Sequence, residues 1–211
     1  MFASVEEALK RIRRGEMVLV TDDEDRENEG DLIMAAAWVT PEAINFMLRW
    51  ARGLVTMPAH ADYLDRLNIH PMLPAGQETV DTPFAIPIDH AQGGSGISAQ
   101  DRALTIRSVL DPDAVATDFV RPGHVFPLRA KPGGVLERRG HTEAAVDLVR
   151  LAGLPPVAVD CEVLHDDGSP ARLPYLQMFC EEHRIAMCTI EQLCKYREEN
   201  SLDDAEVTLV L

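Results

Sequence analysis

Apolar residues along the chain follow two patterns, the helical period and the short continuous runs of buried strands. Helical spacing predicts helices over 4–14, 40–52, 98–111, 142–152 and 174–183, and a last helix that begins near Thr189. Apolar runs of strand length lie at 17–21, 32–37, 54–57, 84–89, 125–128, 157–164 and 185–188. Residues 70–83 include three prolines and one glycine, which predicts a surface loop.

Several of the predicted helices begin at residues that can cap a first turn. Ser4 is followed three positions later by Glu7, and Ser98 by Asp101, so each serine can accept a hydrogen bond from the first turn. Thr142 is the predicted cap of the fourth helix. These capping residues support the predicted helices independently of the spacing of apolar residues.

The order of the elements predicts the fold class. Helices and strands alternate, and we find no linker, internal repeat or low-complexity tract at which to divide the chain. We therefore expect an α/β protein with α+β layers, a single compact domain in which helices flank a mixed sheet. Residues 1–200 are the expected domain, and residues 201–211 an acidic C-terminal tail.

Charge and composition exclude several classes of partner. The 211 residues hold 20 Lys plus Arg against 35 Asp plus Glu, a net charge of −15, which disfavours nucleic acid and anionic membranes. No stretch approaches the ~20 apolar residues of a membrane span, and the N-terminus lacks the features of a secretory signal. Four cysteines without CxxC spacing indicate reduced thiols, and hence a cytoplasmic protein, and make a zinc site improbable.

The acidic run from Asp22 to Asp31 is the first candidate site. It packs seven carboxylates into ten positions between two apolar segments, with the single cation Arg26 among them. A solvated acidic loop is the usual interpretation of such a run. However, a run at the edge of the core also suits a hard cation such as Mg²⁺, which takes one or two carboxylates together with water and substrate oxygens.

A basic cluster, Arg138 to Glu143, is the second candidate site. It precedes a predicted helix, whose free N–H groups and positive dipole end suit a phosphate. The arginines and Thr142 add further hydrogen-bond donors, which an acidic protein needs in order to hold an anionic substrate. The alternative is a capped helix that has a basic segment in front of it.

Two single residues complete the set. His124 lies in Arg121–Pro127, where prolines and a glycine predict a stiff turn that fixes its direction, although a lone histidine is more often structural. Glu162 lies in an apolar strand, and alternation places it on the same face as Asp160. That face is either the solvent side of an edge strand or the wall of a pocket, where a carboxylate can transfer protons.

Together these segments resemble the 3,4-dihydroxy-2-butanone 4-phosphate synthases of riboflavin biosynthesis. The resemblance covers nearly the whole chain, and the first and fourth of its motifs are highly specific. It implies a lyase that converts ribulose 5-phosphate to L-3,4-dihydroxy-2-butanone 4-phosphate and formate, with Mg²⁺ or Mn²⁺, two ions per site. It also implies a homodimer with active sites near the subunit interface. The motifs that carry it lie at 22–36, 96–107, 118–130, 133–148 and around Cys161.

The resemblance also implies roles for individual residues. Glu27 and His141 would hold the metal, and His124 and Glu162 would be catalytic. Substrate contacts would fall to Arg26, Glu27, Asp31, Ser98, Arg138, Arg139, Gly140, His141, Thr142 and Glu162. The chain has no room after residue 211 for the GTP cyclohydrolase II domain of fused relatives, so the stand-alone form is expected.

The sequence departs from the family pattern at two places near the expected substrate. Many relatives have cysteine where this chain has Thr56, and the segment 76–83 differs from the usual loop. A divergent paralogue that acts on another sugar phosphate is therefore an alternative, as is a catalytically inactive metal-binding regulatory module. The chemistry itself needs acids and bases rather than a covalent nucleophile, and these residues supply them.

Overall fold

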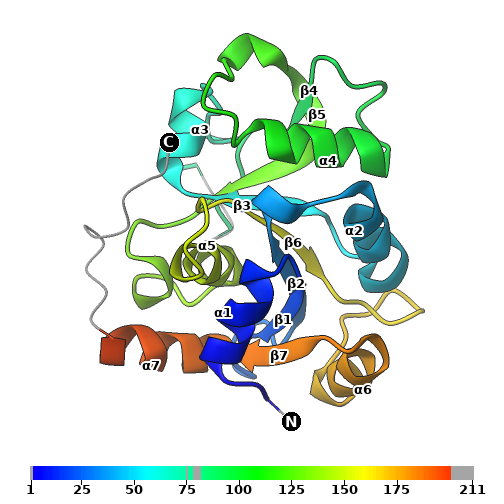
Figure 1. The fold of residues 1–211 in the computed structure, drawn as a ribbon, viewed down its shortest axis with the longest axis vertical. Helices are drawn as coiled ribbons and strands as arrows, with labels where there is room; N and C mark the ends of the chain where they lie inside the picture. Colours follow the sequence, from blue (N-terminus) through cyan, green and yellow to red (C-terminus); the bar gives the residue numbers. More distant parts are fainter. Residues whose placement is uncertain (1, 75, 78–81, 201–211) are drawn as a thin grey trace.

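The computed structural model describes residues 2–74, 76–77 and 82–200 (Figure 1). Its helices are α1 (Val5–Arg13), α2 (Pro41–Phe46), α3 (Ala61–Arg66), α4 (Ala99–Ser108), α5 (His141–Leu151), α6 (Leu173–His183) and α7 (Ile190–Asn200). Its strands are β1 (Val18–Thr21), β2 (Gly30–Ala35), β3 (Thr56–Ala59), β4 (Ile88–His90), β5 (Phe119–Arg129), β6 (Ala158–Glu162) and β7 (Ala186–Thr189). The predicted tail 201–211 and part of the predicted loop 70–83 lie outside the described residues.

The seven strands form one mixed sheet in the order β4-β5-β3-β6-β2-β1-β7. β1 pairs parallel with β7, and β3 parallel with β5, whereas the other neighbours are antiparallel. Asp31 on β2 lies directly opposite Glu162 on β6, and Asp160 lies opposite Thr56 on β3. These registers bring four polar side chains to one face of the central strands.

Both faces of the sheet are covered, so the strands are buried on two sides. On one face α1, α5 and α7 pack against residues such as Val18, Val20 and Ile33. On the other face α2, α4 and α6 cover Leu19, Leu32 and neighbouring residues. This confirms the prediction of a mixed sheet flanked by helices. None of the described helices combines the length and apolar character that crossing a bilayer requires.

The structure corrects the prediction for Thr142 and for Arg121–Pro127. Gly140, not Thr142, is the N-cap of α5, and Thr142 lies within the first turn. The segment with His124 is part of the long strand β5 and not a turn. Its Gly123 faces the backbone of Ile88, where a Cβ would clash, so the glycine that indicated a turn instead allows β4 to lie close.

Smaller differences concern the ends of elements. The helix predicted over 40–52 is α helical to Phe46 and then widens to a π-helical turn over Met47–Ala51. The strand predicted at 84–89 is shorter, because regular pairing begins only at Ile88. The six-residue helix α3 has no counterpart in the sequence prediction, since it is too short for a helical stripe to develop.

Candidate active site

The acidic run forms the connection between the antiparallel strands β1 and β2, and Asp22 organises it from within. The Asp22 side chain is 1% exposed, and its two oxygens accept hydrogen bonds from the backbone N–H groups of Glu27 and Glu29 at 3.0 and 2.8 Å. Arg26 donates at 2.7 Å to both Asp22 and Glu27. Arg26 therefore orients the carboxylates of Asp22 and Glu27, and hydrogen bonds within the run hold it in one shape.

The basic cluster forms the start of α5. Because Gly140 has no side chain, no side-chain cap covers the first turn. A Cβ at Gly140 would clash with the guanidinium of Arg138, so the glycine lets Arg138 fold over the helix end. Arg138 is ion-paired at 2.6 Å with Glu143, whose side chain is fully buried. The result is a helix N-terminus with a positioned arginine, a suitable seat for an anion.

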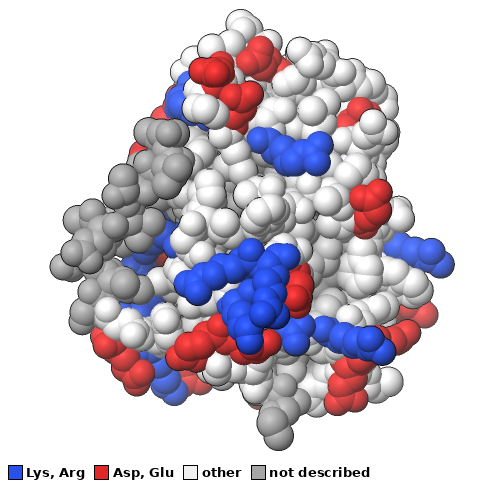
Figure 2. Space-filling view, in the orientation of Figure 1, with Lys and Arg blue, Asp and Glu red and all other residues white. Residues whose placement is uncertain are grey.

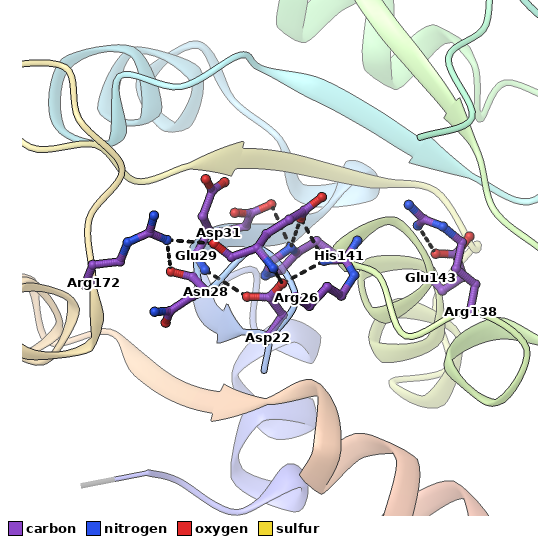
Figure 3. A network of polar contacts seen from close by, with 10 residues as sticks. Asp22, Arg26, Asn28, Glu29, Asp31, Arg138, His141, Glu143 and Arg172 are labelled. Atoms are coloured by element: carbon purple, nitrogen blue, oxygen red, sulfur yellow. Dashed lines mark hydrogen bonds and ion pairs between the residues drawn. The ribbon is translucent and has the colours of Figure 1, made fainter. Parts of the chain in front are cut away.

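His141, the first residue of α5, faces the acidic loop (Figure 3). Its Nδ1 lies 3.6 Å from Asp31 Oδ2 and 3.8 Å from Glu27 Oε2. Burial lowers the pKa of the imidazole, but the charges of Asp31 and Glu27 outweigh burial and raise the His141 pKa to about 9. In turn His141, with help from Arg26, lowers the Glu27 pKa to about 2 against the effect of burial.

Strands β2, β3 and β6 provide the floor of the site. Asp31 and Asp160 are both buried, and desolvation raises the pKa of each carboxyl. The nearby charge of Glu162 raises both pKa values further, and Asp31 also raises that of Asp160. Glu162 accepts a hydrogen bond at 2.8 Å from the N–H of Leu54. The Thr56 hydroxyl, on the neighbouring strand, is buried and makes no hydrogen bond within the described part of the protein.

These groups enclose a cavity of about 200 Å³. Seven residues expected from the sequence line it: Arg26, Glu27, Asp31, Arg138, His141, Thr142 and Glu162. The sequence also pointed to Thr56, and to Asp160 through its alternation with Glu162, and both contribute to the wall. Glu29, from the acidic run, and Thr82, from the segment 76–83, also line it. The remaining wall residues, Phe84 and Leu128, are apolar and carried no signal in the sequence that pointed to the site.

Four expected site residues do not line this cavity. Gly140 is the N-cap residue of α5 and has no side chain to reach the cavity, and Arg139 next to it is exposed. Ser98 caps α4, its hydroxyl accepting at 3.0 Å from the N–H of Asp101. His124 pairs instead with Asp89, Nδ1 to Oδ2 at 2.6 Å, and its backbone N–H donates to the same carboxylate at 2.9 Å.

His124 and Asp89 form a second group of interacting polar residues, at the β4–β5 edge of the sheet. Asp89 is buried, whereas the side chain of His124 is 44% exposed. A Cβ at Gly96 would clash with the Asp89 carboxylate, so the glycine-rich segment before α4 makes room for this acid. A buried carboxylate that fixes one nitrogen of an exposed imidazole is the arrangement of an oriented acid–base group.

The residues fit a divalent metal ion. Ligand atoms of Asp22, Glu27 and His141 all lie within 4.8 Å of one another. Asp22 is already occupied by three donors within the loop, which leaves Glu27 and His141 as the available pair. His141 Nε2 is buried without a hydrogen-bond partner among the described residues. Carboxylate and imidazole donors suit Mg²⁺ or Mn²⁺ when substrate oxygens and water complete the shell.

The charge distribution also suits an anionic substrate. On the face drawn in Figure 2, basic side chains gather near the centre over α1, whose last turn carries Lys10, Arg11 and Arg13, and the cavity has two cations of its own. Arg26 and Arg138 both line the cavity within a chain of net charge −15. The local field can therefore attract a phosphate that the protein as a whole would repel.

Comparison with known proteins assigns the family. The family model of 3,4-dihydroxy-2-butanone 4-phosphate synthase matches residues 6–196. The fold and the acid-, histidine- and arginine-lined cavity define a candidate metal-dependent enzyme for a phosphorylated substrate. The chain belongs to the 3,4-dihydroxy-2-butanone 4-phosphate synthase family.

Curated relatives are longer than this chain. It is 56% identical over 199 residues to the riboflavin biosynthesis protein RibBA of Aquifex aeolicus, covering 93% of this chain and 49% of that protein. It is 47% identical to the RibBA of Bacillus subtilis, with coverage of 100% and 53%. The chain thus spans about half the length of these relatives.

Solved structures match the fold closely. A 3,4-dihydroxy-2-butanone 4-phosphate synthase described as a complex with two magnesium ions superposes with a TM-score of 0.89. Its identity is 38%, and the match covers 95% of this chain and 99% of that one. The Candida albicans synthase gives a TM-score of 0.86 at 47% identity, with coverage of 93% and 98%.

Proposed function

We propose that this protein converts ribulose 5-phosphate to L-3,4-dihydroxy-2-butanone 4-phosphate and formate. Family membership supports the reaction, and the single observation that carries it is the cavity that joins Glu27 and His141 to Arg138 at the start of α5. The sugar would lie between the carboxylates of β2 and β6, with its phosphate at the helix N-terminus. Atoms balance between substrate and products, so the reaction needs no oxidant or reductant.

Glu27 and His141 are the residues that would hold Mg²⁺ or Mn²⁺. A divalent ion there would act as a Lewis acid toward neighbouring oxygens of the sugar and favour loss of a proton next to the ketone. The synthase described with two magnesium ions supports two ions per site here as well. Arg26 pairs with Glu27, and Glu27 and Asp31 both face Nδ1 of the His141 imidazole.

The remaining side chains bind the substrate and move protons. Arg138, Thr142 and the uncapped N–H groups of α5 would bind the phosphate. Glu162, held by the N–H of Leu54, and His124, held by Asp89, are the proposed proton carriers. Arg139 and Ser98 are proposed as outer substrate contacts, which the resemblance alone supports.

We further propose a homodimer, because His124 does not line the cavity of its own chain. Leu128, which does line it, is four residues further along β5, roughly 13 Å away at the rise of a strand. An exposed imidazole fixed by a buried carboxylate would therefore act in the cavity of a second copy. Apolar Ile97, Val115 and Val120 are each at least half exposed and lie near this edge in sequence, which suits such an interface.

The first experiment measures formate release from ribulose 5-phosphate in the presence of Mg²⁺. Formation of both products establishes the synthase. No turnover of this sugar, with turnover of another phosphosugar, establishes a divergent paralogue, and metal binding without turnover of any establishes a regulatory module. Mixing inactive Glu27→Gln and His124→Ala proteins tests the dimer, since up to a quarter of the activity should return if the two residues serve one site from different chains.

Three further assignments are proposals of the same kind. Residues 1–200 would form the synthase domain and 201–211 an acidic tail. The synthase reaction would need no residues from a second domain, and the nearly complete coverage of two solved synthases supports this. The protein would work in the cytoplasm, which four buried, unpaired cysteines support.

A further inference from the structure

We infer that Arg172 is a positioning residue that holds the acidic loop in the shape that directs Glu27 at His141. The inference rests on the proposed metal site, and nothing in the sequence pattern singled out this arginine. Arg172 is the N-cap residue of α6, and its guanidinium reaches back across 145 positions to the loop. There it donates to two consecutive backbone carbonyls, those of Glu27 at 2.7 Å and of Asn28 (Figure 3).

This contact completes the restraint on the Glu27 backbone. The N–H of Glu27 donates at 3.0 Å to the buried carboxylate of Asp22, and its C=O accepts from Arg172. The backbone N–H and C=O of Glu27 are therefore both bound by side chains, those of Asp22 and Arg172. The next residue, Asn28, has a left-handed φ of +54°, which asparagine adopts more readily than most other non-glycine residues, so the loop turns at the residue whose carbonyl Arg172 also binds.

The base from which Arg172 reaches the loop is itself rigid. Leu176, one turn into α6, packs so closely on Gly30 that a Cβ there would lie 2.5 Å from the leucine. Gly30 is the first residue of β2 and the end of the acidic loop. Leu176 is buried, so α6 is packed against the end of the loop at Gly30, while Arg172 binds the loop at Glu27 and Asn28. One nitrogen of the guanidinium, Nη1, donates to both carbonyls, and the planar group fixes the directions of its two N–H bonds, whereas those of a lysine ammonium rotate freely.

A purely electrostatic role and a positioning role of Arg172 predict opposite changes in metal affinity when the side chain is made neutral. A positive charge beside a cation site repels the cation, so a purely electrostatic role means that removing Arg172 tightens metal binding. If Arg172 positions the loop, removing it weakens metal binding although a repulsive charge is lost. Partners that orient metal ligands from outside the coordination shell typically contribute about 10- to 100-fold in metal affinity.

The test compares Arg172→Gln and Arg172→Lys with the wild-type protein in two measurements without substrate. Mn²⁺ titration, followed by electron paramagnetic resonance, should show affinity about tenfold weaker in Arg172→Gln, with Arg172→Lys in between. Hydrogen–deuterium exchange of the metal-free proteins should show faster exchange at the amides of Glu27 and Glu29, which Asp22 protects. Melting temperatures show that each variant is folded.

Arg66→Gln is the matched control, because Arg66 also binds backbone carbonyls, those of Val109, Asp111, Pro112 and Ala114, far from the acidic loop. It should leave Mn²⁺ affinity and loop exchange unchanged. Unchanged loop exchange in Arg172→Gln, or Mn²⁺ binding as tight as or tighter than in wild type, would overturn the role of Arg172. A wild-type protein that binds no Mn²⁺ would instead overturn the metal site proposed above.

Discussion

Arg138 and Glu143 form a buried ion pair 2.6 Å long at the entrance to helix α5, with side chains 11% and 0% exposed. The other oxygen of Glu143 accepts at 3.0 Å from the backbone N–H of Lys131. Glu143 thus fixes both the guanidinium that faces the cavity and the segment that leads to it. An acid in a phosphate site would ordinarily weaken anion binding, but here it keeps the cation in place for the anion.

Replacement of Glu143 by glutamine should therefore raise KM for ribulose 5-phosphate about tenfold and change kcat less. The neutral amide keeps the shape but removes the charge that holds Arg138, and a hydrogen bond to a charged group contributes ~1.5–3 kcal/mol. Steady-state kinetics measures the effect. Glu191→Gln is the control, because its pair with Lys195 is exposed on both sides and should contribute little. A drop in kcat with unchanged KM would contradict a positioning role for Glu143.

Loss of Arg138 itself should separate phosphorylated from unphosphorylated substrate. We expect Arg138→Gln to weaken binding of ribulose 5-phosphate by about 10- to 100-fold, the size of a charge-assisted hydrogen bond, and binding of ribulose much less. The two affinities can be measured by calorimetry on the same protein preparations. Equal losses for both sugars would show that Arg138 serves the fold rather than the phosphate.

Local chemistry explains which elements the sequence predicted correctly. Ser4 and Ser98 each accept a hydrogen bond from the first turn of the helix they were expected to cap, because capping depends on only four neighbouring residues. The prediction that Thr142 caps its helix was wrong because of contacts between residues that are not neighbours in the cap motif. Arg138 folds over Gly140 and pairs with Glu143, which places the helix start two residues earlier than the pattern indicated.

The site was predictable to the extent that its residues lie in compact motifs. Glu27 and His141 lie in two such motifs, and simple alternation placed Asp160 beside Glu162 on one strand. The hold of Arg172 on the acidic loop spans 145 positions, and the pair of His124 and Asp89 spans 35. Such contacts follow from the packing of helices and strands on one another, so no local spacing reports them.

The metal ligands should link stability to pH. In the metal-free protein the His141 pKa is raised to about 9 from an unfolded value of ~6.5, so the folded state holds a proton that the unfolded chain releases. This stabilisation is complete below pH 6.5 and is lost as pH rises through 9. Between pH 6.5 and 8.0, below the usual cysteine pKa, denaturation in a chelator should show a loss of about 1.5 kcal/mol.

Saturating Mg²⁺ should remove this loss, because a metal ion binds the neutral imidazole and competes with the proton. The His141→Gln variant provides the control, and its stability should change less than that of the wild type over the same pH range, with the remaining slope due to Asp31, whose pKa burial raises to about 7. An unchanged pH slope in that variant would assign the effect to another group. The same titrations with Mn²⁺ should show affinity that rises with pH, with protons released on binding.

Direct substitution of the ligands should abolish turnover without unfolding the protein. Glu27→Gln and His141→Ala each remove one donor from the pair that faces the cavity, and Glu27 is a half-exposed loop residue whose loss the fold can tolerate. Formate release should fall to background, and the melting transition should persist. A chelator should remove activity from the wild-type protein and added Mg²⁺ restore it, whereas full activity in the metal-free protein would contradict the assignment.

Thr56 tests whether the family's cysteine at this position takes part in the chemistry. Thr56 is 3% exposed, lines the cavity and lies opposite Asp160. Its hydroxyl is buried without a hydrogen-bond partner among the described residues. A threonine hydroxyl does not ionise near neutral pH, whereas a thiol can. We expect the wild-type protein to be active, because Glu162, His124 and the acidic loop supply the proton carriers, and Thr56 to serve as a hydrogen-bonding wall.

Thiol-alkylating reagents should leave this activity unchanged, since all four cysteines are buried and burial raises the pKa of Cys180 and Cys188 to about 12. Thr56→Val keeps the shape of the side chain and removes only the hydroxyl, so it should lower kcat/KM about tenfold if that hydroxyl binds the sugar. Thr56→Cys should change turnover by much less than a hundredfold, which is the size of a general acid or base contribution. A gain of that size across the pH profile would mean that proton transfer at this position limits the threonine enzyme, and that Glu162 and His124 do not suffice.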